Sequence, residues 1–122
     1  DNFVGQQSQL AYLMALDGEG NREEPSYGPK LYQYDLLSGH CNEHFLGQGT
    51  RGAEPVYAAV PSSKAENDGW VMCLVHNEHL NKSKLVIIDA DNFSAAPVAS
   101  IELPYPVPYG AHGNWVEDRQ LN

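Results

Sequence analysis

The sequence predicts an all-β chain that is built from propeller-type blades. Its apolar runs are short and are separated by Gly, Pro, Asn and Asp, which is typical of strands. No segment keeps apolar residues at i, i+3, i+4 and i+7 over three turns, as an amphipathic helix would. The motifs LYQYD at Leu31 and LVIID at Leu85 lie 54 positions apart. A repeat of about 50 residues that holds four strands has the size of a propeller blade.

Seven runs carry the composition and alternation of strands, and turn residues separate them. We expect strands at LAYLMALD (10–17), KLYQYDL (30–36), CNEHFL (41–46), EPVYAAV (54–60), GWVMCLVH (69–76), SKLVIIDA (83–90) and PVASIEL (97–103). DGEGN follows the first run, LSGH the second, ENDG precedes the fifth, and DADNFSAA joins the last two. Because these connections are short, neighbouring strands should pair antiparallel.

The apolar pattern of two runs favours a propeller over a β-sandwich. In 69–76 and 83–90 both alternating sets of side chains are apolar, which predicts strands covered on both faces. A sandwich, the alternative that the pattern leaves open, usually buries one face of each sheet. We divide the chain into a partial blade with an interblade loop (1–53), a complete four-stranded blade (54–103) and an extended C-terminal segment (104–122). About two blades cannot close a ring, so we expect a piece of a larger protein.

Composition narrows the partners and the location. With 16 acidic and 7 basic residues, the formal charge of −9 argues against a nucleic-acid partner. No apolar run reaches the ~18 residues of a membrane-spanning helix. Cys41 and Cys73 are too few for a disulfide framework, so we expect a reducing, cytoplasmic location. The start of the chain at Asp1 shows neither Met nor a signal peptide, which also suggests a piece of a longer chain.

Several motifs that often carry chemistry lack the context that they need. GQGTRG (47–52) has the spacing of a dinucleotide fingerprint, but a strand follows it instead of a helix, so we interpret it as an interblade loop. The pairs Cys41/His44 and Cys73/His76 lie on predicted strands, where a separation of three sends side chains to opposite faces. Neither pair can therefore chelate zinc from its strand. Histidines near turns or polar residues are expected to be solvated: His40, His44 and His79.

His112 stands in a different setting, PYPVPYGAHGNW. Three prolines between positions 104 and 108 remove backbone donors, so the segment should be extended and cannot lie in the middle of a sheet. Gly110 and Gly113 would let the backbone pass close to another group, and Trp115 offers an apolar anchor. The pattern alone leaves a structural histidine and a ligand histidine equally open.

The motifs together resemble a known family. LYQYDLLSG, AEPVYAAVPSSKAENDGWVMCLV, SKLVIIDADNFSAAPVASIELP and VPYGAHGNWV cover most of the chain. In order and spacing they are similar to the C-terminal part of the iron-dependent carotenoid cleavage oxygenases, which include apocarotenoid and lignostilbene dioxygenases. The resemblance implies a seven-bladed propeller, of which this chain would supply the C-terminal blades.

The resemblance also implies a site. In this family one Fe(2+) per full-length chain lies on the propeller axis, bound by four histidines, the last of which corresponds to His112. A glutamate in the EPV motif, here Glu54, would orient a ligand histidine. The other ligands would lie on blades upstream of Asp1, so we expect the 122 residues alone to be inactive.

The implied reaction is oxidative cleavage of a C=C double bond by O2, which gives two carbonyl products. The substrate would be a small apolar conjugated molecule such as a carotenoid, an apocarotenoid or a stilbene. The alternative is a non-catalytic propeller segment used for binding or assembly, in which His112 is structural. Association with a membrane is left open by the sequence.

Overall fold

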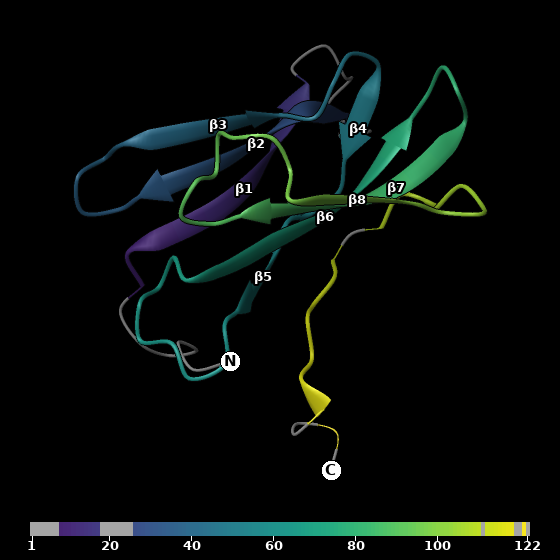
Figure 1. The fold of residues 1–122 in the computed structure, drawn as a ribbon. Helices are drawn as coiled ribbons and strands as arrows, with labels where there is room; N and C mark the ends of the chain where they lie inside the picture. The colour runs from purple at the N-terminus through teal and green to yellow at the C-terminus, as the bar shows by residue number, and fades with distance from the viewer. Residues whose placement is uncertain (1–7, 18–25, 111, 119–120, 122) are drawn as a thin grey trace.

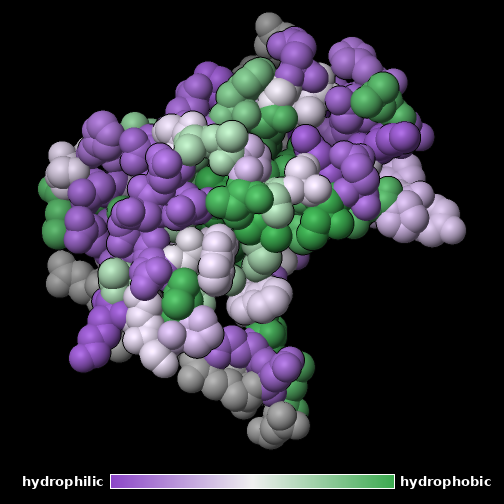
Figure 2. Space-filling view, in the orientation of Figure 1, coloured by the Kyte–Doolittle hydropathy of each residue, from purple (hydrophilic) through white to green (hydrophobic). Residues whose placement is uncertain are grey.

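The computed structural model describes residues 8–17, 26–110, 112–118 and 121, and within them two antiparallel sheets are formed (Figure 1). The first sheet contains β1 (Leu10–Asp17), β2 (Ser26–Asp35) and β3 (Cys41–Phe45). The second contains β4 (Thr50–Gly52), β5 (Val56–Ala59), β6 (Gly69–Asn77), β7 (Lys82–Asp89) and β8 (Ala99–Glu102). In the view of Figure 2, hydrophobic side chains gather near the middle of the molecule. Within the described residues, no helix has the length and apolar character needed to cross a membrane.

The strands follow one another in space as they do in the chain. The first sheet has the order β1-β2-β3, and the second has the order β4-β6-β7-β8 with β5 also paired to β6. Residues 78–81 join β6 to β7, and residues 90–98, which include most of the predicted turn DADNFSAA, join β7 to β8; both pairs are antiparallel. The division into blades at 53/54 and 103/104 stays a prediction, because the sheets show strand order and not the architecture of the whole protein.

The edge strand of the second sheet is broken in two. β4 pairs with the end of β6 through Gly52 and Val75, and β5 pairs with its beginning through Val56 and Met72. The ladder is interrupted at Pro55, which has no N–H to donate. Part of GQGTRG, interpreted above as a loop, is therefore the strand β4. Its first two glycines, Gly47 and Gly49, have positive φ as in a turn, but pairing with β6 begins directly afterwards at Thr50.

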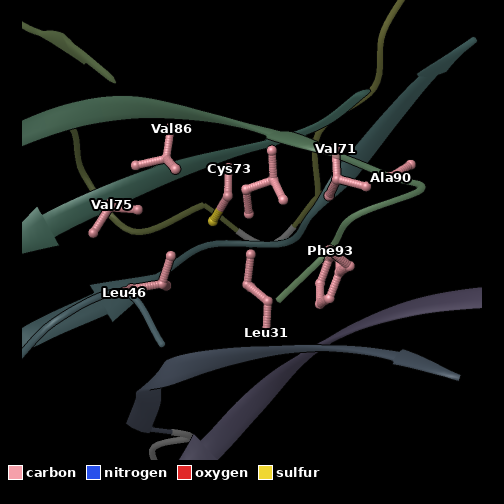
Figure 3. Close-up of a cluster of buried hydrophobic side chains, with 9 residues drawn as sticks. Leu31, Leu46, Val71, Cys73, Val75, Val86, Ala90 and Phe93 are labelled. Atoms are coloured by element: carbon pink, nitrogen blue, oxygen red, sulfur yellow. The ribbon is translucent and has the colours of Figure 1, made fainter. Parts of the chain in front are cut away.

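The core lies between the two sheets (Figure 3). It consists of nine buried side chains from β2, β6, β7 and the segments after β3 and β7: Leu31, Leu46, Val71, Cys73, Val75, Val86, Ile88, Ala90 and Phe93. His44, expected to be solvated, is only 4% exposed, so that expectation is wrong. The segment after β7 covers it, and its Nδ1 lies 2.8 Å from the carbonyl oxygen of Phe93.

The two faces of β6 differ in burial. Val71 and Val75 are buried, as is Cys73 between them, whereas Trp70 and Leu74 on the other face are 40% and 37% exposed. The two alternating sets of side chains do point to opposite faces of the strand. Burial of both faces is not found within the described residues, because only the core face packs against the other sheet. The second face of β6 and β7 is apolar and open, and it lines two cavities beside the C-terminal segment.

Candidate metal centre

The C-terminal segment leaves the second sheet after β8 and runs without strand partners toward His112 (Figure 1). Its start is still bonded to β7, because the Leu103 N–H donates to the Ser83 carbonyl oxygen at 2.9 Å. Further along, the Val107 N–H donates to Ser83 Oγ at 2.9 Å. The extended course follows from the prolines, which remove donors at every second position.

His112 meets Glu54 at the end of this course. The imidazole Nδ1 lies 3.2 Å from Glu54 Oε2 and 3.3 Å from Oε1. The Gly113 N–H donates to the same Oε2 at 3.1 Å. Glu54 comes from the break between β4 and β5, where Pro55 interrupts the ladder, so its side chain projects from an irregular point of the sheet edge. The structure thus brings together the two site residues that the sequence singled out, although they lie 58 positions apart.

This geometry determines which ring nitrogen can act as a ligand. The carboxylate accepts a hydrogen bond from Nδ1–H, so the Nε2 lone pair is left for another partner. The imidazole is 86% exposed and the Glu54 side chain 38%. A carboxylate behind the ring fixes the tautomer and raises the basicity of the other nitrogen, which is the usual arrangement of a metal-binding histidine. The role of the pair toward a metal stays a prediction.

The glycines beside His112 are not explained by crowding. A Cβ on Gly110 would meet nothing within 4 Å, and one on Gly113 would meet only Val56 Cγ2 at 3.7 Å, an ordinary contact. The close approach expected from these glycines is therefore not seen among the described residues. Ala111, between Gly110 and His112, lies outside them.

A cavity of about 390 Å³ opens beside the pair. The walls of the cavity are mainly apolar and come from β5, β6, β7 and the C-terminal segment: Val56, Met72, Leu74, Leu85, Val107 and Trp115. Arg51 and His76 are polar members of the wall. The His112 imidazole therefore borders a mainly apolar space whose wall includes a few polar side chains.

The described residues contain one carboxylate-backed imidazole and no complete metal site. Among them, no group of three or more His, Cys, Asp or Glu side chains could hold an ion. Cys41 is exposed, whereas His44 is buried, so this pair points to opposite sides of its strand. Burial raises the pKa of the Cys73 thiol to about 12. One histidine with a carboxylate on Nδ1 fits one ligand position of the metal site that the resemblance implies.

Five further residues around the segment were not predicted from the sequence: Tyr27, Arg51, His76, Ser83 and Tyr109. They come from β2, β4, β6, β7 and the segment itself, and they converge only because the sheets are folded. The one local signal was the isolated N–H of Val107 between two prolines, which needs an acceptor.

The chain is all-β, and its C-terminal segment carries a histidine backed by a carboxylate. These features are those of a β-propeller protein with a candidate metal ligand. Residues 1–117 match the sequence model of the family described as retinal pigment epithelial membrane protein. The chain belongs to this family, which confirms the resemblance stated above.

The chain is also similar to curated proteins of this kind. It is 36% identical over 88 residues to the apocarotenoid-15,15'-oxygenase of Synechocystis sp., covering 71% of this chain and 18% of the relative. It is 34% identical over 133 residues to carotenoid 9,10(9',10')-cleavage dioxygenase 1 of Phaseolus vulgaris, covering 99% and 24%. It is 38% identical over 100 residues to resveratrol cleavage oxygenase 1 of Botryotinia fuckeliana, covering 82% and 17%.

A solved structure supports the fold. The cobalt-substituted Synechocystis apocarotenoid oxygenase superimposes with a TM-score of 0.82 at 29% identity, over 94% of this chain and 23% of that one. The predicted fold class, all-β propeller blades, is thereby confirmed. The chain spans about a quarter or less of the length of these relatives.

Proposed function

We propose that this chain is part of a non-haem iron(II) dioxygenase that cleaves a C=C double bond. The substrate is of the carotenoid, apocarotenoid or stilbene type, and O2 supplies the oxygen of two carbonyl products. The names of the relatives support this class of reaction, since they are oxygenases of apocarotenoids, carotenoids and resveratrol.

The observation that carries the proposal is the contact between Glu54 and His112. A carboxylate 3.2 Å from Nδ1 holds the imidazole in the tautomer whose Nε2 can bind a metal. Imidazole nitrogen suits Fe(2+), and the same kind of ligand binds other first-row divalent metals. The related Synechocystis enzyme has been obtained in a cobalt-substituted form, which fits a site of this ligand type.

Within this proposal the residues of the chain have separate tasks. His112 binds the iron through Nε2, and Glu54 orients the ring by accepting its Nδ1–H. The chemistry that Fe(2+) supplies when bound is the activation of O2. Apolar walls beside the pair, with Met72, Leu74 and Trp115 among them, suit a conjugated hydrocarbon better than a charged substrate.

The rest of the site and of the ring comes from outside these residues. We propose that three further histidines bind the same iron from other blades. We also propose that the remaining blades cover the open apolar face of β6 and β7, where Trp70 and Leu74 are 40% and 37% exposed. A cytoplasmic location is proposed because Cys41 and Cys73 are both free thiols.

The test is the substitution His112→Ala in the full-length protein that contains these residues, with His40→Ala as the control at an exposed histidine. Iron per chain is measured by elemental analysis, the fold by circular dichroism, and the products of carotenoid, apocarotenoid and stilbene substrates by chromatography. We expect His112→Ala to lose iron and cleavage while the fold is retained. Unchanged iron content would rule out the ligand role and favour the non-catalytic propeller segment.

A further inference from the structure

The segment that carries His112 is held at two backbone points by side chains from different sheets. Ser83 on β7 is 1% exposed, and its Oγ accepts the Val107 N–H at 2.9 Å. The same Oγ lies 3.1 Å from His76 Nδ1, which gives the buried hydroxyl a second partner. Tyr27 on β2 donates its hydroxyl to the Gly110 carbonyl oxygen at 3.3 Å.

An aromatic contact links these two points. The ring of Tyr109 lies against that of Tyr27, with centroids 5.7 Å apart. It also meets His76 edge-on, with centroids 5.9 Å apart and ring planes at 84°. Burial and the nearby carboxylate of Glu78 raise the pKa of the Tyr109 hydroxyl. This phenol is therefore protonated at neutral pH and adds no negative charge beside the segment.

Tyr27 is itself fixed from the second sheet. Arg51 on β4 donates from Nη1 to the Tyr27 carbonyl oxygen at 2.7 Å, and its Nε lies 3.2 Å from Glu78 Oε2. The guanidinium therefore joins the start of β2 to the turn after β6. The Tyr27 end of the contact to Gly110 is therefore attached to both sheets.

These contacts matter because the segment has no ladder of its own. Strand pairing ends with β8 at Glu102, and Leu103 makes the last backbone bond to β7. From there to His112, the two side-chain contacts at Val107 and Gly110 replace the ladder. They lie five and two residues before the imidazole. Any shift of the backbone at these points moves the ring relative to Glu54.

We propose that Ser83 and Tyr27 are positioning residues for His112, and this inference rests on the function proposed above. Through its bond to the Val107 N–H, Ser83 fixes the distance of the segment from β7. Through its bond to the Gly110 carbonyl oxygen, Tyr27 fixes the backbone orientation just before His112. Neither is a metal ligand in this proposal. They restrict the movement of the His112 ring, so that its Nε2 keeps one position relative to the iron.

The experiment uses the full-length, iron-loaded protein with Ser83→Ala and Tyr27→Phe, each of which removes one hydroxyl. Ser100→Ala is the matched control, because Ser100 is an exposed serine on the neighbouring strand β8. The rate of iron release to a chelator is measured per folded chain. The visible absorption of the cobalt(II)-substituted protein is measured as well, because it reports ligand geometry and not stability. If Ser83→Ala does not fold, Tyr27→Phe carries the test, since Tyr27 is only partly buried.

We expect both variants to release iron about threefold to tenfold faster, the effect of losing one hydrogen bond, and to shift the cobalt bands. Ser100→Ala should behave as the unsubstituted protein. Release at the original rate with an unchanged cobalt spectrum would overturn the inference, even if the melting temperature falls, since the contacts would then be structural only. His112→Ala, run beside them, tests the proposed function separately. If it loses iron, the ligand assignment holds whatever the other variants show, and if it retains iron, both proposals fail.

Discussion

Replacing Glu54 by glutamine separates the role of this residue toward a metal from its role in the fold. In the structure one carboxylate oxygen, Oε2, lies 3.2 Å from His112 Nδ1 and 3.1 Å from the Gly113 nitrogen, and Oε1 lies 3.3 Å from the same Nδ1. A carboxylate can accept at both oxygens. A glutamine amide can accept at one only, and its NH₂ group then faces the Nδ1–H or the Gly113 N–H as a second donor.

The expected magnitudes differ for the two roles. Loss of a charged acceptor behind a metal-binding imidazole typically lowers metal affinity about 10- to 100-fold, which corresponds to roughly 1.4–2.8 kcal/mol. The imidazole is 86% and the Glu54 side chain 38% exposed, so the pair should contribute less than about 1 kcal/mol to folding stability. Glu54→Gln should therefore weaken iron binding strongly and leave the melting temperature almost unchanged.

The assay is an equilibrium titration of apoprotein with Fe(2+) under anaerobic conditions, in competition with a chelator of known affinity. Glu102→Gln is the control, because Glu102 is an exposed glutamate at the end of β8. An affinity of Glu54→Gln within twofold of the control would refute the reasoning, since the carboxylate would then not orient the imidazole. A large loss of stability with unchanged affinity would show that Glu54 serves the fold.

Two further predictions concern thiols and acid stability. Burial raises the pKa of the Cys73 thiol to about 12, so iodoacetamide at pH 7–9 should modify the exposed Cys41 and spare Cys73 until the protein is unfolded. Peptide mass spectrometry measures the labelling of each cysteine, and rapid labelling of Cys73 would contradict its burial. Burial opposes the charge of Glu66, but its hydrogen bonds, including those from the N–H groups of Gln9 and Leu10, outweigh this and lower its pKa below the ordinary 4.5. The stability that Glu66 contributes is thus present above about pH 4.5 and is lost as the pH falls through its lowered pKa. In Glu66→Gln the melting temperature, measured against pH, should therefore change less in this window. An unchanged pH dependence would show that the contact contributes nothing.

The strands could be predicted where alternation and turn residues agreed. The first predicted strand, 10–17, coincides with β1; the run 69–76 is one residue shorter than β6, and the run 83–90 is shifted by one residue from β7. β4 was missed because three residues in a glycine-rich stretch carry no alternation of their own. They become a strand only through pairing with the far end of β6, a contact that no local pattern records.

The site could be predicted in part. The resemblance to the oxygenases singled out Glu54 and His112, and the structure places them within hydrogen-bond distance. The residues that hold the segment could not be found in this way. Val107 and Ser83 are 24 positions apart, and Gly110 and Tyr27 are 83 apart, so no spacing or motif links them. His44 was misjudged for the same reason, since its polar neighbours in sequence gave no sign of the carbonyl of Phe93 that covers it.

The apolar face of β6 shows where pattern and structure diverge for a physical reason. Apolar side chains on both faces of a strand are expected where both faces are covered. The described residues cover only one face of β6. Val71 and Val75 meet the other sheet, but Trp70 and Leu74 border open cavities, one of them about 830 Å³ in size. The remaining blades, proposed above to cover this face, would supply the missing partner. The His112 imidazole, 86% exposed, borders the same cavity as Leu74, so the blades proposed to cover this face would also adjoin the proposed metal ligand.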